Sequence, residues 1–370
     1  MNKYRIVIAS VLKPVTEPRA FGKLALSMRE TSKYHINIIG FCSKNTVKED
    51  SIRLTPVFCR KRTHLYRLFV PFRFFKELVS YRPHLVIVTT YELLPMALLA
   101  KAILKFRLVY DLQENYSQNV LLNRSGGAML RHLTASLIRG IEKLAHPFVD
   151  HYFFAEKSYQ QQFPLIAQFT VLENKFAGAV EPLSPPRLSK EPLFIISGTI
   201  TPVYGIEKAI YWFLSLREKF PLARLHIVGH VPLENFQERL YKLTAGQQGI
   251  SLNISLQPLS YKTLLKAVRQ ADVVLMPYED LDSIRYKIPS KLYESLALRK
   301  PILISKNPVW EKALQEYPAG LAVDFSKSRD AAAVFQKLIE LDLYKKSPDV
   351  EVLWEGEKPK LLRTLQHLLD

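Results

Sequence analysis

Hydrophobic residues in the first half of the chain form short β-branched runs that alternate with longer stretches of helical spacing. The runs predict strands at residues 5–9, 36–40, 85–88, 107–110, 152–154 and 170–172. The stretches between them predict helices at residues 20–32, 65–79, 95–105, 128–144 and 157–163. Because strands that alternate with helices are typical of parallel βαβ units, we expect an α/β domain with a doubly wound sheet.

A second set of the same kind follows a proline-rich stretch at residues 181–192. Its prolines lack a backbone N–H and disfavour regular structure, which indicates a linker. Beyond it, apolar runs predict strands at residues 193–197, 224–228, 250–255, 273–276, 301–304 and 322–323. We therefore expect two domains, residues 1–180 and 193–350. Such sheets bind ligands at the carboxyl ends of their strands, and two that face each other form a cleft.

Charge is distributed unevenly along the chain. Its 370 residues carry 52 Lys and Arg against 34 Asp and Glu, a formal net charge of +18, while 48% hydrophobic residues is ordinary for a folded protein. Residues 1–180 hold 26 of the basic and 12 of the acidic side chains, a net charge of +14. Residues 51–76 include seven basic side chains and no acidic one. This excess bears on binding partners and not on the fold.

Cysteine usage and hydropathy bear on the compartment. Cys42 and Cys59 are too few for a disulfide framework or for clustered zinc ligands, which favours a reducing compartment. The best candidate for a membrane span, residues 85–100, is interrupted by Glu92 and Pro95 and is shorter than the roughly 18 residues needed. No cleavage site of small residues follows the first apolar run. We expect a cytoplasmic protein.

Several common catalytic motifs are absent from the sequence. It has no Gly-x-Gly-x-x-Gly after the first strand, no phosphate loop ending in Gly-Lys-Ser/Thr, no Gly-x-Ser-x-Gly and no His-Glu-x-x-His. Its nine histidines form no ligand cluster. Dehydrogenase, nucleoside triphosphatase, serine hydrolase and zinc peptidase functions therefore lack their usual support.

The most informative segment follows the strand at residues 273–276. A polar loop with Arg285 and Lys287 leads to a helix that should start near Pro289, with Ser290 in its first turn. The free N–H groups of a helix N-terminus, together with Lys291 and the loop cations, could hold a diphosphate. Glu294 could then accept hydrogen bonds from ribose hydroxyls. The alternative is that Lys291 and Glu294 form an ordinary (i, i+3) surface pair.

In this segment the chain resembles the retaining GT-B glycosyltransferases of group 1, the family-four type. That family has a Pro-x-Lys-x-x-Glu-x-x-Ala-x-Gly-x-Pro-like pattern, and the chain matches it with Pro289, Lys291, Glu294, Ala297 and Pro301, with Arg299 in place of the glycine. The resemblance implies two Rossmann-like domains facing across a cleft, with Glu294 on the ribose of a sugar nucleotide. Tyr286 stands where many relatives have a second glutamate that contacts the donor sugar.

Further matches extend along the second half of the chain. Residues 196–207 resemble the family's glycine loop near the donor phosphates, although Thr199 and Tyr204 occupy the places of its usual Arg and Lys. Residues 225–229 are similar to its strand and glycine near the base, and residues 351–370 to its tail helix that returns to the first domain. The resemblance therefore implies these donor-binding residues: Gly198, Thr199, Gly229, Tyr286, Lys287, Ser290, Leu292 and Glu294.

The first domain carries two weaker matches. Residues 17–23 resemble an Asp-Pro-Arg-Val-Phe-Lys-type loop, and residues 110–116 a Tyr-Asp-x-His-Glu-x-Tyr segment in which Gln113 replaces the histidine. The family's later His-Asp pair is replaced by Thr89 and Thr90. These matches imply acceptor or cleft residues: Arg19, Phe21, Asp111 and Gln113. The alternative for Asp111 and Glu114 is that they only cap the end of a strand.

The implied reaction moves a sugar from a nucleoside diphosphate donor to a glycan, lipid-linked or small-molecule acceptor. Negative charge develops on the leaving diphosphate, so fixed cations and helix dipoles accelerate the step. We expect Lys291 and Arg285 to stabilise the leaving group and Glu114 to position the acceptor hydroxyl. The resemblance implies no protein nucleophile, no metal and no cofactor other than the sugar nucleotide substrate.

Residues 65–76 mix cations with large apolar side chains, a composition suited to an anionic membrane interface. We expect either a peripheral position at the inner membrane face or a helix with its aromatic residues in the core and its cations solvated. Two other functions stay open. The departures at Tyr286, Gln113, Thr89 and Thr90 favour an inactive GT-B scaffold, and the basic charge alone would suit nucleic acid, for which no binding motif is present.

Overall fold

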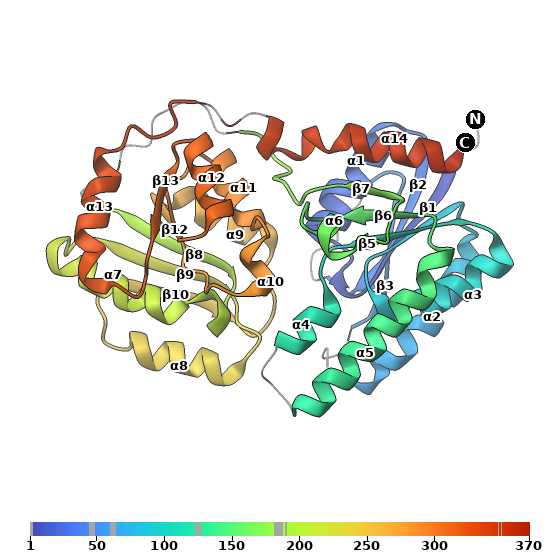
Figure 1. The fold of residues 1–370 in the computed structure, drawn as a ribbon, viewed down its shortest axis with the longest axis horizontal. Helices are drawn as coiled ribbons and strands as arrows, with labels where there is room; N and C mark the ends of the chain where they lie inside the picture. Colours follow the sequence, from blue (N-terminus) through green and yellow to red (C-terminus); the bar gives the residue numbers. More distant parts are fainter. Residues whose placement is uncertain are drawn as a thin grey trace. The chain divides into compact units, whose positions relative to one another are not determined.

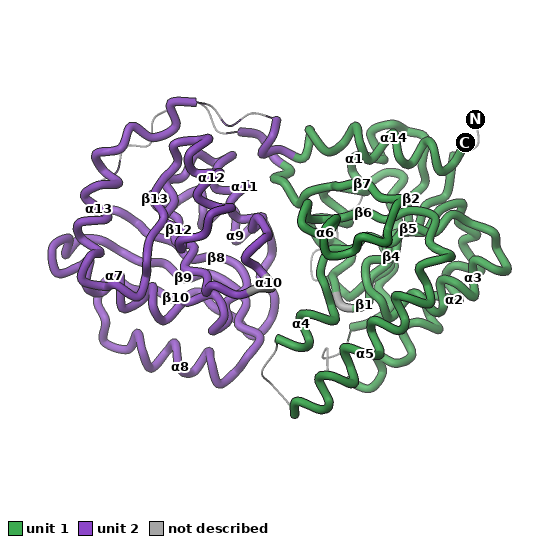
Figure 2. The backbone as a smooth tube through the Cα atoms, viewed as in Figure 1, with its two compact units in different colours: residues 1–177, 354–370 green, residues 178–353 purple. Residues whose placement is uncertain are grey.

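The computed structural model of the chain contains two compact units (Figures 1 and 2). It describes residues 3–43, 49–59, 64–122, 127–180, 188, 191–346, 348 and 350–370. Unit 1 consists of residues 1–177 and 354–370, and unit 2 of residues 178–353. Within the expected linker, residues 181–187 and 189–190 lie outside the described residues, as do Arg60, Lys61 and Arg62 of the basic segment.

Unit 1 is built on a parallel sheet of seven strands in the order β3-β2-β1-β4-β5-β6-β7. The strands are β1 (Tyr4–Pro14), β2 (Tyr34–Phe41), β3 (Ile52–Phe58), β4 (Leu85–Val88), β5 (Arg107–Leu112), β6 (His151–Phe154) and β7 (Phe169–Val171). The sequence pattern did not predict β3. This strand contains Pro56, and proline is confined to edge strands because it has no N–H for the ladder. β3 is indeed an edge strand.

Helices cover both faces of this sheet. The helices on one face are η2 (Leu65–Phe69), α2 (Val70–Tyr81), η3 (Tyr91–Leu93), α3 (Leu94–Leu104), α5 (Ala128–Ala145) and η4 (His146–Phe148), which contribute to or adjoin one apolar core. On the other face, η1 (Pro18–Ala25), α1 (Leu26–Glu30) and α14 (Lys358–Leu369) close a second core. Two short helices complete the unit, α4 (Tyr116–Leu122) and α6 (Tyr159–Gln162).

The C-terminal segment is part of unit 1. Leu361 and Leu365 of α14 are fully buried in the second core, and the indole Nε1 of Trp354 donates to Ser27 Oγ at 2.8 Å. The carboxylate of Glu357 is fully buried and lies 2.8 Å from Lys175 Nζ. Burial alone would raise the pKa of Glu357, but hydrogen bonds from Lys175 and Lys360 lower it below its ordinary value.

Replacing Glu357 by Gln should therefore destabilise unit 1 in a pH-dependent way. A carboxylate with a lowered pKa stabilises the fold above its unfolded pKa, and this contribution is lost as pH falls through the folded pKa. At neutral pH we expect a loss of about 1.5–3 kcal/mol, the range of hydrogen bonds to charged groups. Urea unfolding at several pH values checks this. The difference in free energy of unfolding between wild type and variant should shrink as the pH falls. A difference that does not change with pH would show that the charge of Glu357 is not what stabilises unit 1.

Unit 2 has a parallel sheet of six strands in the order β10-β9-β8-β11-β12-β13. The strands are β8 (Leu193–Thr199), β9 (Arg224–His230), β10 (Ile250–Ser255), β11 (Val273–Met276), β12 (Ile302–Ser305) and β13 (Gly320–Val323). The rings of Trp212, Phe213 and Phe335 pack on Phe194 of β8 with centroids 5.2–6.5 Å apart. All six strands agree with the sequence prediction.

Helices and helical turns connect the strands of unit 2. They are η5 (Pro202–Tyr204), α7 (Ile206–Lys219), α8 (Glu234–Thr244), α9 (Tyr261–Gln270), α10 (Asp282–Arg285), α11 (Ser290–Ala297) and α12 (Pro308–Glu316). After the last strand come η6 (Ser328–Asp330), α13 (Ala331–Glu340) and η7 (Val350–Val352), and η8 (Trp354–Gly356) opens the returning segment in unit 1. α11 begins at Ser290, directly after Pro289, as its sequence indicates.

Both sheets share one topology. Counted from the first strand of its own unit, each has the order 3-2-1-4-5-6, with a seventh strand added in unit 1. In such sheets the chain leaves the first and fourth strands in opposite directions, which opens a crevice at their carboxyl ends. The crevices lie between β1 and β4 in unit 1 and between β8 and β11 in unit 2. The expected pair of doubly wound α/β domains is confirmed.

The structure bears on two expectations from the sequence, one about the cysteines and one about a membrane span. Cys42 and Cys59, which follow β2 and β3, form a disulfide with a Cα–Cα distance of 5.0 Å, although their number had argued against a disulfide framework. In the part of the chain that the structure describes, no helix combines the length and apolar character needed to cross a membrane.

Candidate active site

Lys291 lies over the carboxyl end of β8. It occupies the first turn of α11, and its Nζ donates to Ser197 Oγ at 3.1 Å. Gly198, the next residue of β8, has a φ of +103°, a conformation that favours glycine. A Cβ added there would also overlap Cε and Nζ of Lys291. The backbone conformation of Gly198 therefore favours glycine, and the absence of a Cβ leaves room for the tip of the lysine.

The surroundings of Lys291 suit an anion. Burial lowers the pKa of its ammonium group, and the nearby Glu294 carboxylate opposes that shift. The backbone N–H groups in the first turn of α11 add partial positive charge beside it. A partly buried ammonium group with a hydroxyl as its neighbour gains most from a ligand that brings negative charge. The crevice between β8 and β11 can therefore hold a phosphate group.

Glu294 is held by a tyrosine that the sequence pattern did not single out. Its carboxylate is only 8% exposed, and Oε2 accepts a hydrogen bond from the hydroxyl of Tyr261 at 2.9 Å. Burial and the charge of Glu294 raise the pKa of Tyr261, so the phenol stays neutral and donates. The alternative of an ordinary surface pair with Lys291 does not describe these side chains, which bond to Ser197 and Tyr261 instead.

Gly229 and Leu292 have structural roles at this crevice. Gly229 pairs with Gly198 across β9 and β8, and a Cβ there would overlap the carbonyl oxygen of Gly198. The Leu292 side chain is fully buried, and its N–H donates to the carbonyl of Pro289 at 2.8 Å. Leu292 thus has a core position, and its donor contact stays an expectation from the resemblance. Thr199 and Ser290 are exposed.

In the segment before α11, Arg285 forms an ion pair with Asp280. Nε and Nη2 of Arg285 donate to the two carboxylate oxygens of Asp280, each at 2.8 Å. Tyr286 is 59% exposed, and the carbonyl of Lys287 accepts from Trp310 Nε1 at 2.7 Å. The guanidinium of Arg285 would have to leave Asp280 to reach a leaving group. Of Lys291 and Arg285, Lys291 is the cation whose described contacts lie at the carboxyl end of β8.

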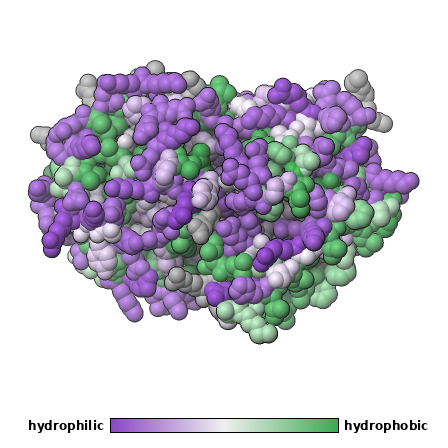
Figure 3. Space-filling view, viewed as in Figure 1, coloured by the Kyte–Doolittle hydropathy of each residue, from purple (hydrophilic) through white to green (hydrophobic). Residues whose placement is uncertain are grey.

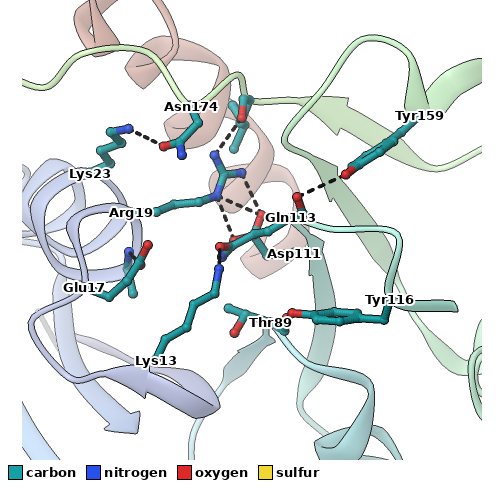
Figure 4. Close-up of polar contacts among 12 residues, drawn as sticks. Lys13, Glu17, Arg19, Lys23, Thr89, Asp111, Gln113, Tyr116, Tyr159 and Asn174 are labelled. Atoms are coloured by element: carbon teal, nitrogen blue, oxygen red, sulfur yellow. Dashed lines mark hydrogen bonds and ion pairs between the residues drawn. The ribbon is translucent and has the colours of Figure 1, made fainter. Parts of the chain in front are cut away.

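In unit 1, Arg19 and Asp111 form a buried ion pair (Figure 4). Nη2 of Arg19 lies 2.7 Å from Oδ1 of Asp111, and Nε lies 2.9 Å from Oδ2, which makes the pair bidentate. Nη1 donates to the carbonyl of Leu172 at 2.8 Å. Although burial alone would lower it, the Asp111 carboxylate raises the pKa of Arg19.

The same close-up shows a chain of polar contacts that leads away from this pair (Figure 4). Nε2 of Gln113 donates to Asp111 Oδ2 at 2.6 Å, and Lys13 Nζ donates to Gln113 Oε1. The hydroxyl of Tyr159 donates to the carbonyl of Gln113 at 3.1 Å. Gln113 therefore occupies the place of the family's histidine as a hydrogen-bonding link between Asp111 and Lys13.

These contacts give Arg19 a structural position, and its cleft role stays an expectation from the resemblance. Its side chain is 1% exposed and Asp111 is 0% exposed, so the guanidinium joins η1 to β5 and does not project toward a ligand. Phe21 is partly buried against the second core of unit 1. Oε2 of Glu114, just before α4, accepts from Nδ2 of Asn119 in α4 at 3.0 Å.

A small pocket lies at the crevice of unit 1. Its walls include Ser10 and Lys13 of β1, Glu17 before η1, and Thr89 after β4. The Thr89 hydroxyl donates to the carbonyl of Ala9 at 3.2 Å, whereas the buried hydroxyl of Thr90 has no hydrogen-bond partner among the described residues. This edge of the sheet is therefore polar where the family has its His-Asp pair.

Sequence reasoning found Lys291 and Glu294 but missed Ser197 and Tyr261. Ser197 ends a predicted strand, and a hydroxyl next to a glycine at that edge is a usable signal. Tyr261 opens a helix after its cap Ser260, a place that carries no indication of contact with Glu294. In the described residues, no three His, Cys, Asp or Glu side chains gather as a metal site.

Comparisons with known proteins agree with this architecture. Residues 183–349 match the family model described as glycosyl transferases group 1. A search of curated proteins gives no match. Among solved structures, sucrose-phosphate synthase from Thermosynechococcus elongatus is 12% identical with a TM-score of 0.69, and the alignment covers 99% of each chain.

Two further solved structures show the same fold. HepE from Anabaena, in complex with UDP and glucose, is 14% identical with a TM-score of 0.63, covering 98% of this chain and 100% of that one. UDP-GlcNAc 2-epimerase from Neisseria meningitidis, bound to UDP-GlcNAc, is 13% identical with a TM-score of 0.59, covering 98% and 100%.

The two units, each with its own crevice, together have the GT-B fold. Within unit 2, residues 183–349 form a group 1 glycosyl transferase domain.

Proposed function

We propose that the chain transfers a sugar from a nucleoside diphosphate sugar to an acceptor hydroxyl, with retention of configuration and without a metal. One observation carries the proposal: Lys291, Gly198 and the N-terminus of α11 converge at the carboxyl end of β8. An ammonium group and free N–H groups at one place are suited to a diphosphate. The complexes of HepE with UDP and UDP-glucose support this donor class.

The chemistry follows from where charge develops. As the glycosidic bond breaks, the diphosphate gains negative charge, and a cation that is already positioned stabilises it without reorganising. Lys291 takes this role, and the buried Glu294 carboxylate accepts from the ribose hydroxyls. Because the chain supplies this positive charge itself, the leaving group can depart without a metal. Glu114 positions the acceptor, which is a glycan, a lipid-linked sugar or a small molecule in glycan biosynthesis.

Thermal stabilisation by a panel of UDP, GDP, dTDP and their sugars tests the donor class, since a ligand that binds only the folded state raises the melting temperature. The outcome expected is a clear rise for one base. No rise with any of these nucleotides would contradict the proposal.

Replacing Glu294 by Ala should then lower the affinity for that nucleotide by about 10- to 100-fold, the range for a lost hydrogen bond to a charged group. Tyr261→Phe should have a smaller effect in the same direction, because the carboxylate stays but loses the hydroxyl that orients it. Isothermal titration with the nucleoside diphosphate and with inorganic pyrophosphate separates the roles, since pyrophosphate has no ribose.

The matched control is Glu238→Ala, an exposed glutamate on α8. It should leave both affinities unchanged. Equal weakening of pyrophosphate and nucleotide by Glu294→Ala would place the carboxylate away from the ribose.

A second candidate function is an inactive GT-B scaffold that binds the nucleotide without turnover. It is favoured by the pairing of Arg285 with Asp280 and by Tyr286 in the place of a glutamate. A coupled assay for nucleoside diphosphate release, with and without acceptor sugars, decides between them. Release that depends on acceptor supports transfer, and binding without any release supports the scaffold.

A further inference from the structure

One helical layer of unit 1 exposes far more apolar surface than a soluble domain needs. We call the outer surface of η2, α2, α3 and α5, residues 65–81, 94–104 and 128–145, the apolar layer. Its exposed large apolar side chains include Leu65 at 77% and Leu68 at 69%. In unit 2, no described large apolar side chain is more than 59% exposed. Contiguous exposed apolar patches of this kind mark interaction sites.

Helix α5 contributes a continuous apolar row to this layer. Met129, Leu133, Leu137 and Leu144 are 77%, 57%, 64% and 75% exposed. Successive residues of an α-helix are about 100° apart, so these four fall within roughly one quarter of its circumference. The opposite side of α5, with the buried Ile138, already packs on the core. The helix therefore has one apolar face for the fold and a second that the fold leaves uncovered.

The rest of the layer adjoins this row. α2 packs beside α3, and α3 beside α5, so their outer sides form one surface. On α2, Phe72 is 59% exposed, and on α3, Ile103 is 60% exposed. Hydrophobic side chains gather over the region of α5 in the space-filling view (Figure 3). The uncovered surface is thus broader than one helix.

The exposed charged side chains of the layer are all basic, while Glu77 of α2 and Glu142 of α5 are partly buried. Beside the apolar row of α5 lies a polar row with the exposed Arg139 and Lys143, and α2 carries the exposed Arg73 and Lys76. Every residue of η2, α2, α3 and α5 is described, and none of their exposed residues is Asp or Glu. Arg73 also lies over the ring of Tyr66, 4.8 Å from its centroid. Apolar side chains flanked by cations are complementary to the surface of an anionic bilayer.

We propose that the apolar layer docks on an anionic lipid bilayer, with the row on α5 inserted at the boundary between headgroups and acyl chains and the flanking cations on lipid phosphates. A second copy of the chain suits this surface less well, because an isologous interface would bring cations against cations. The inference deepens the proposed function by making a lipid-linked acceptor its substrate class. Binding to lipid can nevertheless be measured without any transfer of sugar.

The experiment is flotation of the full chain with vesicles of phosphatidylcholine alone and with about a quarter phosphatidylglycerol. The wild type should float with the anionic vesicles and remain behind with the neutral ones. Leu133→Gln with Leu137→Gln should abolish flotation. Arg139→Glu with Lys143→Glu should weaken partitioning about 30-fold or more, because each cation near such a surface contributes roughly fivefold. All four side chains are exposed, so the variants should keep the fold.

Matched controls carry the same changes elsewhere. Leu165→Gln changes an 86% exposed leucine outside the layer, and Lys242→Glu with Lys266→Glu reverses two exposed cations of unit 2. These should float like the wild type. Absence of the wild type from both vesicle types would overturn the proposal. So would a wild-type dimer, measured by light scattering, that the Leu133 and Leu137 substitutions dissociate without any flotation. Nucleotide binding retained in a non-floating variant separates this proposal from the donor site.

Discussion

The Asp111→Ala variant should lose about 3–5 kcal/mol of free energy of unfolding in unit 1, because it leaves the buried Arg19 guanidinium without its carboxylate. Arg19 is 1% exposed and its remaining described partner is the carbonyl of Leu172. An unpaired charge in such a place is far more unfavourable than the pair is favourable. Urea unfolding followed by hydrogen exchange in β1 and β5 reports unit 1 separately from unit 2 and checks the loss.

A double substitution tests the physical cause. Arg19→Met together with Asp111→Leu removes both charges, and replacing a buried ion pair by apolar side chains is often neutral. We expect the double variant to recover most of the stability that either single variant loses, with a residual deficit because Gln113 also donates to Asp111. Arg53→Ala is the control, because Arg53 is 59% exposed and forms a surface ion pair in which its Nη2 lies 3.6 Å from Oε2 of Glu77. It should change stability by less than about 1 kcal/mol.

Additive single effects would contradict this account. If the losses of Arg19→Met and Asp111→Leu simply add, the two side chains act independently and the pair is not the source of the stability. A loss below about 1 kcal/mol for Asp111→Ala would return Arg19 to the role that the sequence resemblance implied, a cation available to a ligand.

The strands were predictable because a parallel sheet that is buried on both faces requires continuous runs of apolar, often β-branched residues. β11, with the run from Val273 to Met276, is such a case. β3 was not, because Arg53, Thr55 and Pro56 interrupt its pattern, as an edge position permits. The helix at residues 65–79 also differs in detail. It opens as a 3₁₀ turn and becomes α-helical at Val70. The next residue is Pro71, and proline is tolerated in an α-helix only in the first turn.

The candidate site was predictable only in the part that is local in sequence. Lys291 and Glu294 are three positions apart on one helix, and this spacing indicated contacts with an anion and with a ribose. Their partners could not be inferred, since Ser197 is 94 residues from Lys291 and Tyr261 is 33 residues from Glu294. The same holds for Arg19 and Asp111, which are 92 residues apart and meet because η1 packs against the end of β5.

Arg299 shows how a departure from a family pattern can be understood after the fact. It stands where the pattern has glycine, and its φ is +51°, in the left-handed region that glycine enters without strain. The position follows the C-terminus of α11, where helices commonly end in this conformation. The glycine of the pattern therefore serves helix termination, and its loss here does not by itself bear on the donor site.

Replacing Lys291 by Met should reduce turnover by about 100- to 1,000-fold, the loss seen when a group that stabilises developing negative charge is removed. Its side chain is the cation that the structure holds at the carboxyl end of β8, against Ser197 and Gly198. Methionine keeps much of the length and apolar stem, so the fold should persist. Steady-state kinetics with a saturating donor separates this loss from weaker binding. Lys312→Met, an exposed lysine on α12, is the control.

The pH profile distinguishes a charge role from a packing role. Burial lowers the pKa of Lys291 in the free protein, so the kcat/KM of the wild type for the donor should fall as pH rises through a value below the pKa of an ordinary lysine. Lys291→Arg keeps a charge that does not titrate in this range and should lack that alkaline decline, although its larger head beside Gly198 lowers its maximal rate. An identical decline in both proteins would show that another group titrates. Turnover of Lys291→Met within about threefold of wild type would remove the lysine from the reaction altogether, because a transition-state contact of this kind cannot be lost at so small a cost.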